Sequence, residues 1–226
     1  SKVFLFIIFL FLPFGAVAAP PVGPSFWVGA LAAPDSVVLT PGEIEKLNRA
    51  MTASVGQMAE VASLPDEIPG GRLSGWLSFE PLPGPDAPRF SADGKPLRQG
   101  FFDYLRKNMA LDKVLALNPA AFGVVAVRAD IRAFPSDRVV IKRPGGFDTF
   151  QYSSIAPGEK LALLHRSADG AWGFFQTRFV RGWIRLDRVA FGGRGDGPDG
   201  DGGFIVVTGS RETVFGDTAL KRPVLT

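Results

Sequence analysis

The sequence predicts an α+β protein: a helix- and loop-rich N-terminal half, then a small antiparallel β-barrel, then the start of another β module. Three observations predict this order. Apolar residues recur at three- and four-residue spacing before position 119, alternate with polar residues after position 120, and give way to a Gly/Asp-rich stretch at 192–203. With 226 residues, 46% of them hydrophobic, the chain can bury the core of one sizeable domain or two small ones.

The N-terminus has the pattern of a secretory signal peptide. Lys2 precedes an apolar run from Val3 to Leu12, and small residues at Ala16 and Ala18 suit a signal-peptidase site. The run is too short to span a bilayer as a stable helix. We expect residues 1–18 to be removed and the protein to be exported to the periplasm or cell envelope, with no stable membrane span after processing. The alternative is a retained N-terminal anchor.

Residues 19–119 are expected to be helices and loops. The Pro- and Gly-rich residues 19–34 predict an extended arm. Thr40-Pro41-Gly42-Glu43 is a capping box with proline at the first helical position, so a helix begins there. It carries an apolar stripe that we interpret as a packing surface: Ile44, Leu47, Met51, Val55 and Met58.

After a long connection rich in proline, helical spacing resumes near Phe101 and ends at Asn118-Pro119. From residue 120 the period changes to two: in 127–133, small and apolar residues alternate with charged ones, as in a half-buried strand. Further strands are expected at 160–165, 172–175 and 183–185, with a tight hairpin turn at 167–170. Short strands and tight turns over 120–191 predict the barrel.

Residues 192–203 are almost all glycine and aspartate and predict a flexible linker. Within it, Arg194-Gly195-Asp196 matches an integrin-type tripeptide of very low specificity, and the aspartates miss the spacing of an EF-hand calcium loop. Residues 204–226 begin with a new apolar run, which predicts the start of a second β module that is cut short.

The residue content leaves little catalytic chemistry. The chain has no cysteine and one histidine, His165. Disulfides, thiolate nucleophiles and cysteine-ligated metals are therefore excluded, and we predict no catalytic residue, no metal site and no cofactor. His165 and Ser167 lie two apart, but no oriented acid or oxyanion donor pair accompanies them, so we interpret His165 as a residue at the end of a hairpin.

Several segments together resemble one known family. Four segments are similar to the first bacterial SH3-like (SH3b) domain of a group of NlpC-type cell-wall cysteine peptidases. They are 123–135, 148–159, His165-Arg166-Ser167-Ala168-Asp169-Gly170-Ala171-Trp172 and Gly182-Trp183. In that group a helical clip domain precedes two SH3-like barrels and a papain-like domain that cleaves peptidoglycan stem peptides. The resemblance therefore implies a clip at 19–119, an SH3-like barrel at 120–191 and a truncated second SH3-like module at 204–226. The family's catalytic cysteine and histidine have no counterpart here.

The resemblance implies the non-catalytic N-terminal targeting and regulatory part of a secreted peptidoglycan endopeptidase. The expected partners are a peptidoglycan stem peptide and the chain's own C-terminal catalytic domain in a longer parent protein. A stand-alone exported SH3-like binding protein is the main alternative, and an enzyme that uses carboxylates alone is a third. The coding frame beyond Thr226 discriminates between the first two.

Aromatic and basic residues of the barrel are the candidate ligand contacts. Phe147, Phe150 and Tyr152 lie in a polar, glycine-rich segment where exposed rings would form a peptide-binding platform. Trp172, Phe174 and Trp183 are interpreted mainly as core or rim of the barrel. Residues 128–188 hold eleven Lys or Arg against six Asp or Glu, which favours an anionic polymer or is simply a solvated basic face. No nucleic-acid-binding motif is present. The predicted ligand-binding residues are Phe147, Phe150, Tyr152, Trp172 and Arg181.

Overall fold

The computed structural model describes residues 24–33, 35–84, 86–197, 214–215 and 223–225. The chain divides into two compact units, residues 1–47 and 48–226, and each is described by itself. The predicted signal peptide lies outside the described residues, as do residues 198–213 of the predicted linker and second module. None of the helices in the described ranges is long and apolar enough to cross a membrane.

The N-terminal unit contains the helix α1 (Pro24–Gly29) and the first half of α2 (Pro41–Ser54). The expectation of a wholly extended arm before position 34 is wrong, because Pro24 occupies a first helical position that suits proline. The capping box of α2 is confirmed. The backbone N–H of Thr40 donates to Glu43 Oε2 at 2.8 Å, and the N–H of Glu43 approaches Thr40 Oγ1 at 3.4 Å.

The apolar stripe of α2 is not buried. Ile44, Leu47 and Met51 of α2 and Val55 just after it are 43–49% exposed, while Met58, the fifth residue of the stripe, is half-buried. The interpretation of this stripe as a core-facing surface is therefore wrong for the described structure. Helical spacing identifies an apolar face, but it does not determine whether anything packs on that face.

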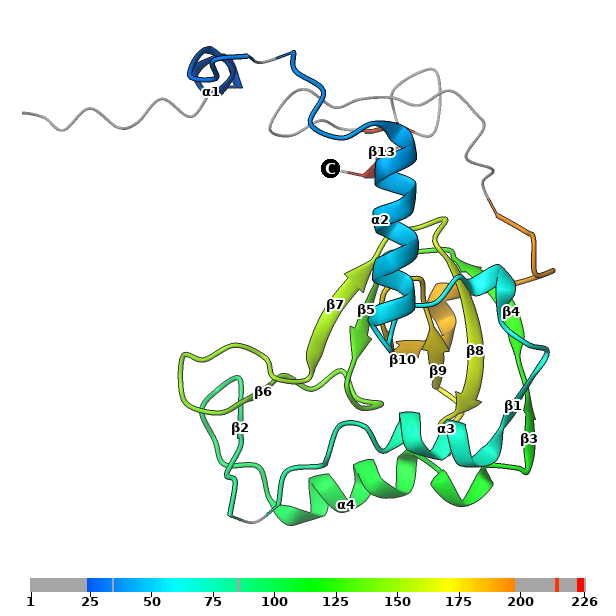
Figure 1. Ribbon diagram of the computed structural model, residues 1–226. Coiled ribbons are helices and arrows are strands. Elements are labelled where there is room, and N and C mark those ends of the chain that lie inside the picture. Colours follow the sequence, from blue (N-terminus) through cyan, green and yellow to red (C-terminus); the bar gives the residue numbers. More distant parts are fainter. Residues whose placement is uncertain (1–23, 34, 85, 198–213, 216–222, 226) are drawn as a thin grey trace, which may run out of the picture. The chain divides into compact units, whose positions relative to one another are not determined.

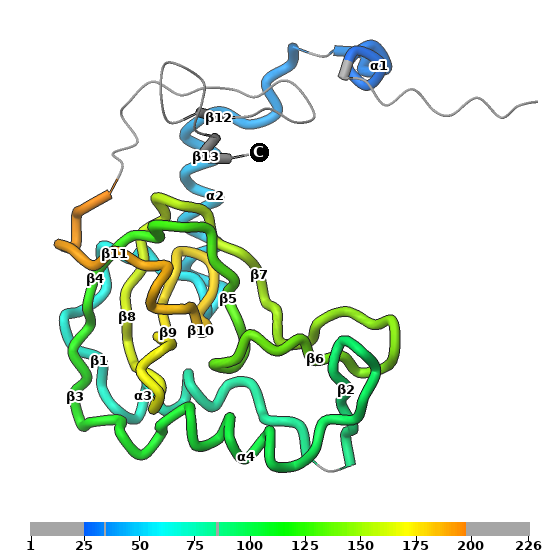
Figure 2. The backbone as a smooth tube through the Cα atoms, turned by 180° about the vertical axis from the view of Figure 1, so that it is seen from behind, coloured from blue at the N-terminus to red at the C-terminus, as the bar shows by residue number. Residues whose placement is uncertain are grey.

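The C-terminal unit is built on a seven-stranded antiparallel sheet, which curves round the core (Figures 1 and 2). The strand order is β11-β4-β8-β9-β10-β5-β7. The bounds in chain order are β4 Ala121–Val125, β5 Ala129–Arg132, β7 Gln151–Ile155, β8 Lys160–Arg166, β9 Trp172–Gln176, β10 Arg181–Arg185 and β11 Val189–Phe191. The prediction of mixed helices and strands with antiparallel sheets is confirmed.

The turn between β8 and β9 is the predicted hairpin. Gly170 has φ 69°, a left-handed conformation that favours glycine. The backbone N–H of Ser167 donates to Trp172 O at 3.0 Å, which closes the hairpin.

Three small strand pairs accompany the main sheet. They are β1 (Glu67–Pro69) with β3 (Leu117–Pro119), β2 (Phe90–Ser91) with β6 (Val140–Ile141), and β12 (Val214–Phe215) with β13 (Pro223–Leu225). The remaining helices of this unit are α3 (Gly70–Leu77), α4 (Gln99–Asn108) and the 3-10 turns η1 (Val61–Ser63), η2 (Leu111–Lys113) and η3 (Leu186–Arg188). Both views show β2 and β6 together, beside the main sheet (Figures 1 and 2).

Helices and sheet share one hydrophobic core. Leu73 and Leu77 of α3 and Leu105 of α4 are buried in the same cluster as Phe134 and Trp183. A second cluster has its buried members on sheet strands, among them Val125, Ile131 and Phe175, and Val180 and Leu186 pack against it from outside the sheet. The predicted core role of Trp183 is confirmed, because its side chain is fully buried. The first cluster continues across positions 119 and 120, so the elements before and after this predicted boundary are packed together.

The described start of the Gly/Asp-rich stretch is held by Arg194. Its guanidinium donates to the carbonyl oxygens of Ala62 and Leu64, pairs with Asp66 and lies 4.0 Å from the ring centroid of Phe122. Arg194 of the tripeptide is therefore engaged within the fold, and residues 192–197 are anchored at this point.

Candidate functional site

The structure separates the predicted aromatic platform. Phe147 lies in the loop between β6 and β7 with 94% of its surface exposed, whereas Phe150 is only 2% exposed. The Phe150 ring lies 4.6 Å from that of Phe134 and stacks on Phe101 at 6.4 Å. The prediction that Phe150 is an exposed ring is wrong, because the loop turns back at Asp148 and directs the ring into the core. Trp172 is likewise buried, so its side chain is core and presents no open face.

A buried ion pair fixes the base of this loop. Arg132 Nη1 lies 2.6 Å from Asp148 Oδ2, and both side chains are largely buried. Arg132 also donates to Gln151 Oε1, Ser136 O and Arg138 O. The strict alternation predicted for 127–133 placed Arg132 on the polar face with Asp130. Arg132 keeps this face, since Gln151 bonds both Asp130 and Arg132, but the segment 136–148 covers the face there and buries the arginine.

Tyr152 and Arg181 are brought together in a narrow crevice, although 29 positions separate them. The crevice is lined by Gln57, Trp76, Leu77, Phe79, Glu80, Ala133, Tyr152, Phe174 and Arg181. Tyr152 is 37% exposed and its hydroxyl donates to Glu80 Oε2 at 3.2 Å. Burial, and secondly the Glu80 carboxylate, raise the pKa of the Tyr152 hydroxyl, so it remains a neutral donor.

Arg181 stands at the start of β10 with its guanidinium 4.3 Å from the ring centroid of Trp76. It donates to Gln176 Oε1 at 2.9 Å and to Gly56 O at 2.7 Å. Sequence reasoning missed Trp76 and Glu80, which face these two predicted residues from α3 and the turn that follows it. No local signal identifies them, because the neighbours are 72 or more positions away in the chain.

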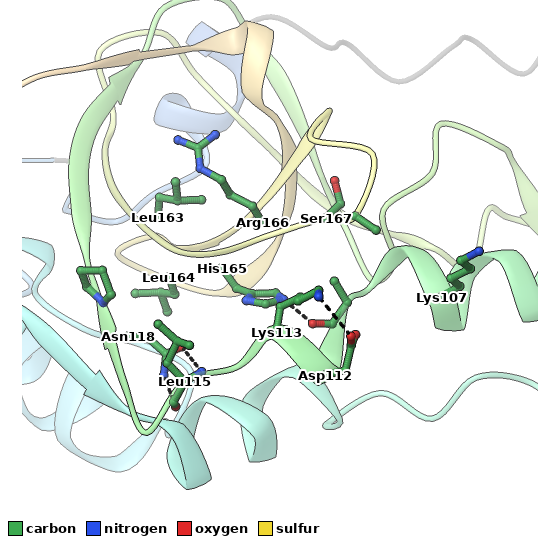
Figure 3. A pocket seen from close by; sticks show the side chains of 13 residues that line it. Lys107, Asp112, Lys113, Leu115, Asn118, Leu163, Leu164, His165, Arg166 and Ser167 are labelled. Carbon is green, nitrogen blue, oxygen red and sulfur yellow. Dashed lines mark hydrogen bonds and ion pairs between the residues drawn. The ribbon is translucent and has the colours of Figure 1, made fainter.

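A cavity of about 560 Å³ lies between β8 and the turn that follows α4 (Figure 3). His165 points toward this turn, and its Nε2 lies 3.1 Å from the carbonyl oxygens of both Met109 and Ala110. Two carbonyl acceptors require Nε2 to carry the proton. Burial lowers the pKa of His165, so the ring is neutral near pH 7.

His165 and Ser167 have different partners in this structure. Ser167 Oγ donates to Asp169 Oδ1 at 2.6 Å and holds the hairpin turn. Lys107, Lys113 and Arg166 lie around the cavity with Asp112, which is 3.7 Å from Lys113. Within the described ranges, no group of three His, Asp or Glu side chains is placed to hold a metal ion.

Residues 145–185 match the SH3 domain family of the SH3b1 type. This SH3b1-type segment contains β7, β8, β9 and β10 and all five predicted ligand-binding residues. The resemblance to an SH3b domain is thus confirmed for this segment. No curated protein matches the sequence.

One solved structure that the chain resembles is that of an NlpC/P60 endopeptidase from Photobacterium damselae subsp. piscicida. The identity is 16% and the TM-score is 0.45, with 68% of this chain covered. The chain spans 37% of the length of that endopeptidase.

Proposed function

We propose that this chain is the non-catalytic N-terminal targeting and regulatory part of a secreted peptidoglycan endopeptidase of the NlpC type. Its SH3b1-type segment contacts the cell-wall stem peptide or shapes the cleft of a catalytic domain in the longer parent protein. The observation that carries this proposal is the match of residues 145–185, in which Tyr152 and Arg181 converge on one crevice.

The crevice itself holds only about 20 Å³, so a peptide lies over it and not inside it, and the surrounding side chains offer the groups that peptide recognition needs. Tyr152 presents part of its ring and a neutral hydroxyl, Glu80 a carboxylate, and Arg181 a guanidinium. An aromatic surface with a few fixed polar groups is typical of peptide and small-ligand sites. Phe147 adds an exposed ring on the same matched segment. The residue that follows it, Asp148, is fixed by its ion pair with Arg132.

The finer organisation belongs to the same proposal. It comprises a signal peptide at 1–18, a clip at 19–119, a barrel at 120–191, a linker at 192–203 and a second SH3-like module from 204. Export to the periplasm or cell envelope follows from the first of these. The Arg194 anchor supports a clip and a barrel that act together, because it ties the chain after β11 to residues 62–66.

Cosedimentation of the protein with purified peptidoglycan tests the proposal. We expect Tyr152→Ala to weaken retention by about tenfold, because a ring contact of 0.5–1.5 kcal/mol and a hydroxyl donor are lost together. The chain has only two tyrosines, so Tyr104→Ala is the matched control. Tyr104 is also exposed and also donates to a carboxylate, that of Asp169 at 3.2 Å. Unchanged retention of Tyr152→Ala, or no retention of the unsubstituted protein, would contradict the proposal.

A further inference from the structure

Two arginines contact one tryptophan, Trp76, and all three side chains line the same cavity. The guanidinium carbons of Arg72 and Arg181 lie 4.8 and 4.3 Å from the ring centroid of Trp76. Arg72 and Trp76 are one helical turn apart on α3, while Arg181 comes from β10. Like charges repel, and Arg72 together with burial lowers the pKa of Arg181, with burial the larger cause.

No carboxylate neutralises this pair among the described residues. Neither arginine forms an ion pair, and Glu80 is engaged by Tyr152. Arg181 uses two of its five N–H donors on Gln176 and Gly56, and Arg72 has no hydrogen-bond acceptor in the described part of the chain. Two guanidinium groups that line one cavity and keep unused donors can together bind an anion there.

A cavity of about 310 Å³ opens beside this pair. Arg72, Trp76 and Arg181 line one side, and Leu64, Pro65 and Ile68 line another. This volume is at the small end of ligand pockets, so it admits only one or two small residues. The apolar wall favours a ligand that carries a small apolar group next to its negative charge.

Glu60 also lines the cavity without pairing with either arginine. A carboxylate in the lining of the same cavity weakens the binding of a dianion more than that of a monoanion, because repulsion scales with the ligand's charge. Phosphate is therefore disfavoured relative to a carboxylate. The planar guanidinium fork also matches carboxylate geometry.

We propose that Arg72, Arg181 and Trp76 form a binding site for the C-terminal carboxylate of a short peptide that ends in a small apolar residue. This inference deepens the proposed function, because Arg181 also lines the Tyr152 crevice, but it makes a separate claim about which end of the peptide is recognised. In this site the carboxylate accepts hydrogen bonds from the two guanidinium groups, and the terminal side chain contacts Leu64 and Pro65.

Isothermal titration with N-acetyl-alanyl-alanine tests the site directly. We expect the free acid to bind at least about tenfold more tightly than the corresponding C-terminal amide, because the amide loses a charge-assisted pair of hydrogen bonds. Arg72→Gln should weaken binding of the acid by about tenfold and leave the amide unaffected. The exposed Arg72 side chain makes no hydrogen bond in the described structure, and its contact with Trp76 contributes little at an exposed site, so the variant should remain folded with a melting temperature close to that of the unsubstituted protein.

Arg178→Gln is the matched control, since Arg178 lies in the β9–β10 turn close to Arg181 in sequence and its side chain is exposed. Equal binding of acid and amide, an Arg72→Gln variant that binds normally, or displacement of the peptide by equimolar inorganic phosphate would each overturn the inference. Retention on peptidoglycan measures the proposed function separately. If retention depends on Tyr152 while the acid and the amide bind equally, the proposed function stands and this inference fails.

Discussion

At the scale of single residues, two phenylalanines three positions apart have opposite environments. Phe147 is almost fully exposed, whereas Phe150 packs on Phe101 and Phe134. We predict that Phe150→Ala lowers the free energy of unfolding by about 3–5 kcal/mol, because it leaves a cavity in the core. Phe147→Ala should change it by less than about 0.5 kcal/mol. Urea unfolding measures both, and a Phe150→Ala protein as stable as Phe147→Ala would contradict the burial of this ring.

Local signals explain why some residues could be placed from the sequence and others could not. Thr40 and Glu43 form the predicted capping box because both partners lie within one helical turn. The burial of Arg132 could not be predicted, because tertiary packing, and not the alternation of its strand, brings the segment 136–148 over it. The contacts of Arg181 with Trp76 depend on chain segments 105 positions apart, which no periodicity brings together.

At the scale of elements, the loop between β5 and β7 depends on the Arg132–Asp148 pair. Asp148 also accepts hydrogen bonds from the backbone N–H groups of Val140 and Phe150, both at 3.0 Å. We predict that Asp148→Asn lowers the free energy of unfolding by about 3–5 kcal/mol, since it leaves the buried Arg132 charge unpaired.

Asp137→Asn provides the control for this prediction. Asp137 pairs with Arg185 at 3.3 Å but its side chain is 71% exposed, so the change should cost less than about 1 kcal/mol. Chemical denaturation of the two variants distinguishes them. Similar small losses in both would show that the Arg132–Asp148 pair does not hold the loop.

The strands β8 to β10 and the helix α2 show what regular spacing of apolar residues predicts and what it does not. The strands from β8 to β10 lie close to their expected ranges because turn residues such as Gly170 mark their ends. The stripe on α2 has equally regular spacing, yet its side chains are exposed. Spacing predicts the element and its apolar face, while burial depends on what the rest of the chain places against that face.

At the scale of the whole molecule, α3 and α4 pack with the sheet in one core, so the packing does not stop at the predicted limit between residues 119 and 120. The sequence indicates that limit because the spacing of apolar residues changes there from three or four positions, as in a helix, to two, as in a strand. A change of period marks a change of element type and contains no information about tertiary packing. The structure contains helices before this limit and strands after it, but the domain limit between residues 119 and 120 remains a prediction.

The single histidine makes the pH dependence of the whole molecule interpretable near neutrality. Lys107, Lys113 and Arg166 line the same cavity as His165, and Asp112 is the one carboxylate in that lining. Burial lowers the pKa of His165 below the usual 6.5. The unfolded chain then binds a proton more readily than the folded protein does as the pH falls. The stabilising contribution is complete above pH 6.5 and decreases as the pH falls below that value toward the folded-state pKa.

We therefore predict that the melting temperature falls between pH 7 and pH 5.5, and that His165→Gln flattens this part of the profile. Glutamine retains an N–H donor for the carbonyl oxygens of Met109 and Ala110 and does not titrate. Carboxylates of ordinary pKa titrate mainly below this range, so they leave the difference between the two profiles intact. Thermal melts at half-unit pH steps measure it. Parallel profiles for the two proteins would show that His165 is protonated equally in the folded and unfolded chains, contrary to its buried position.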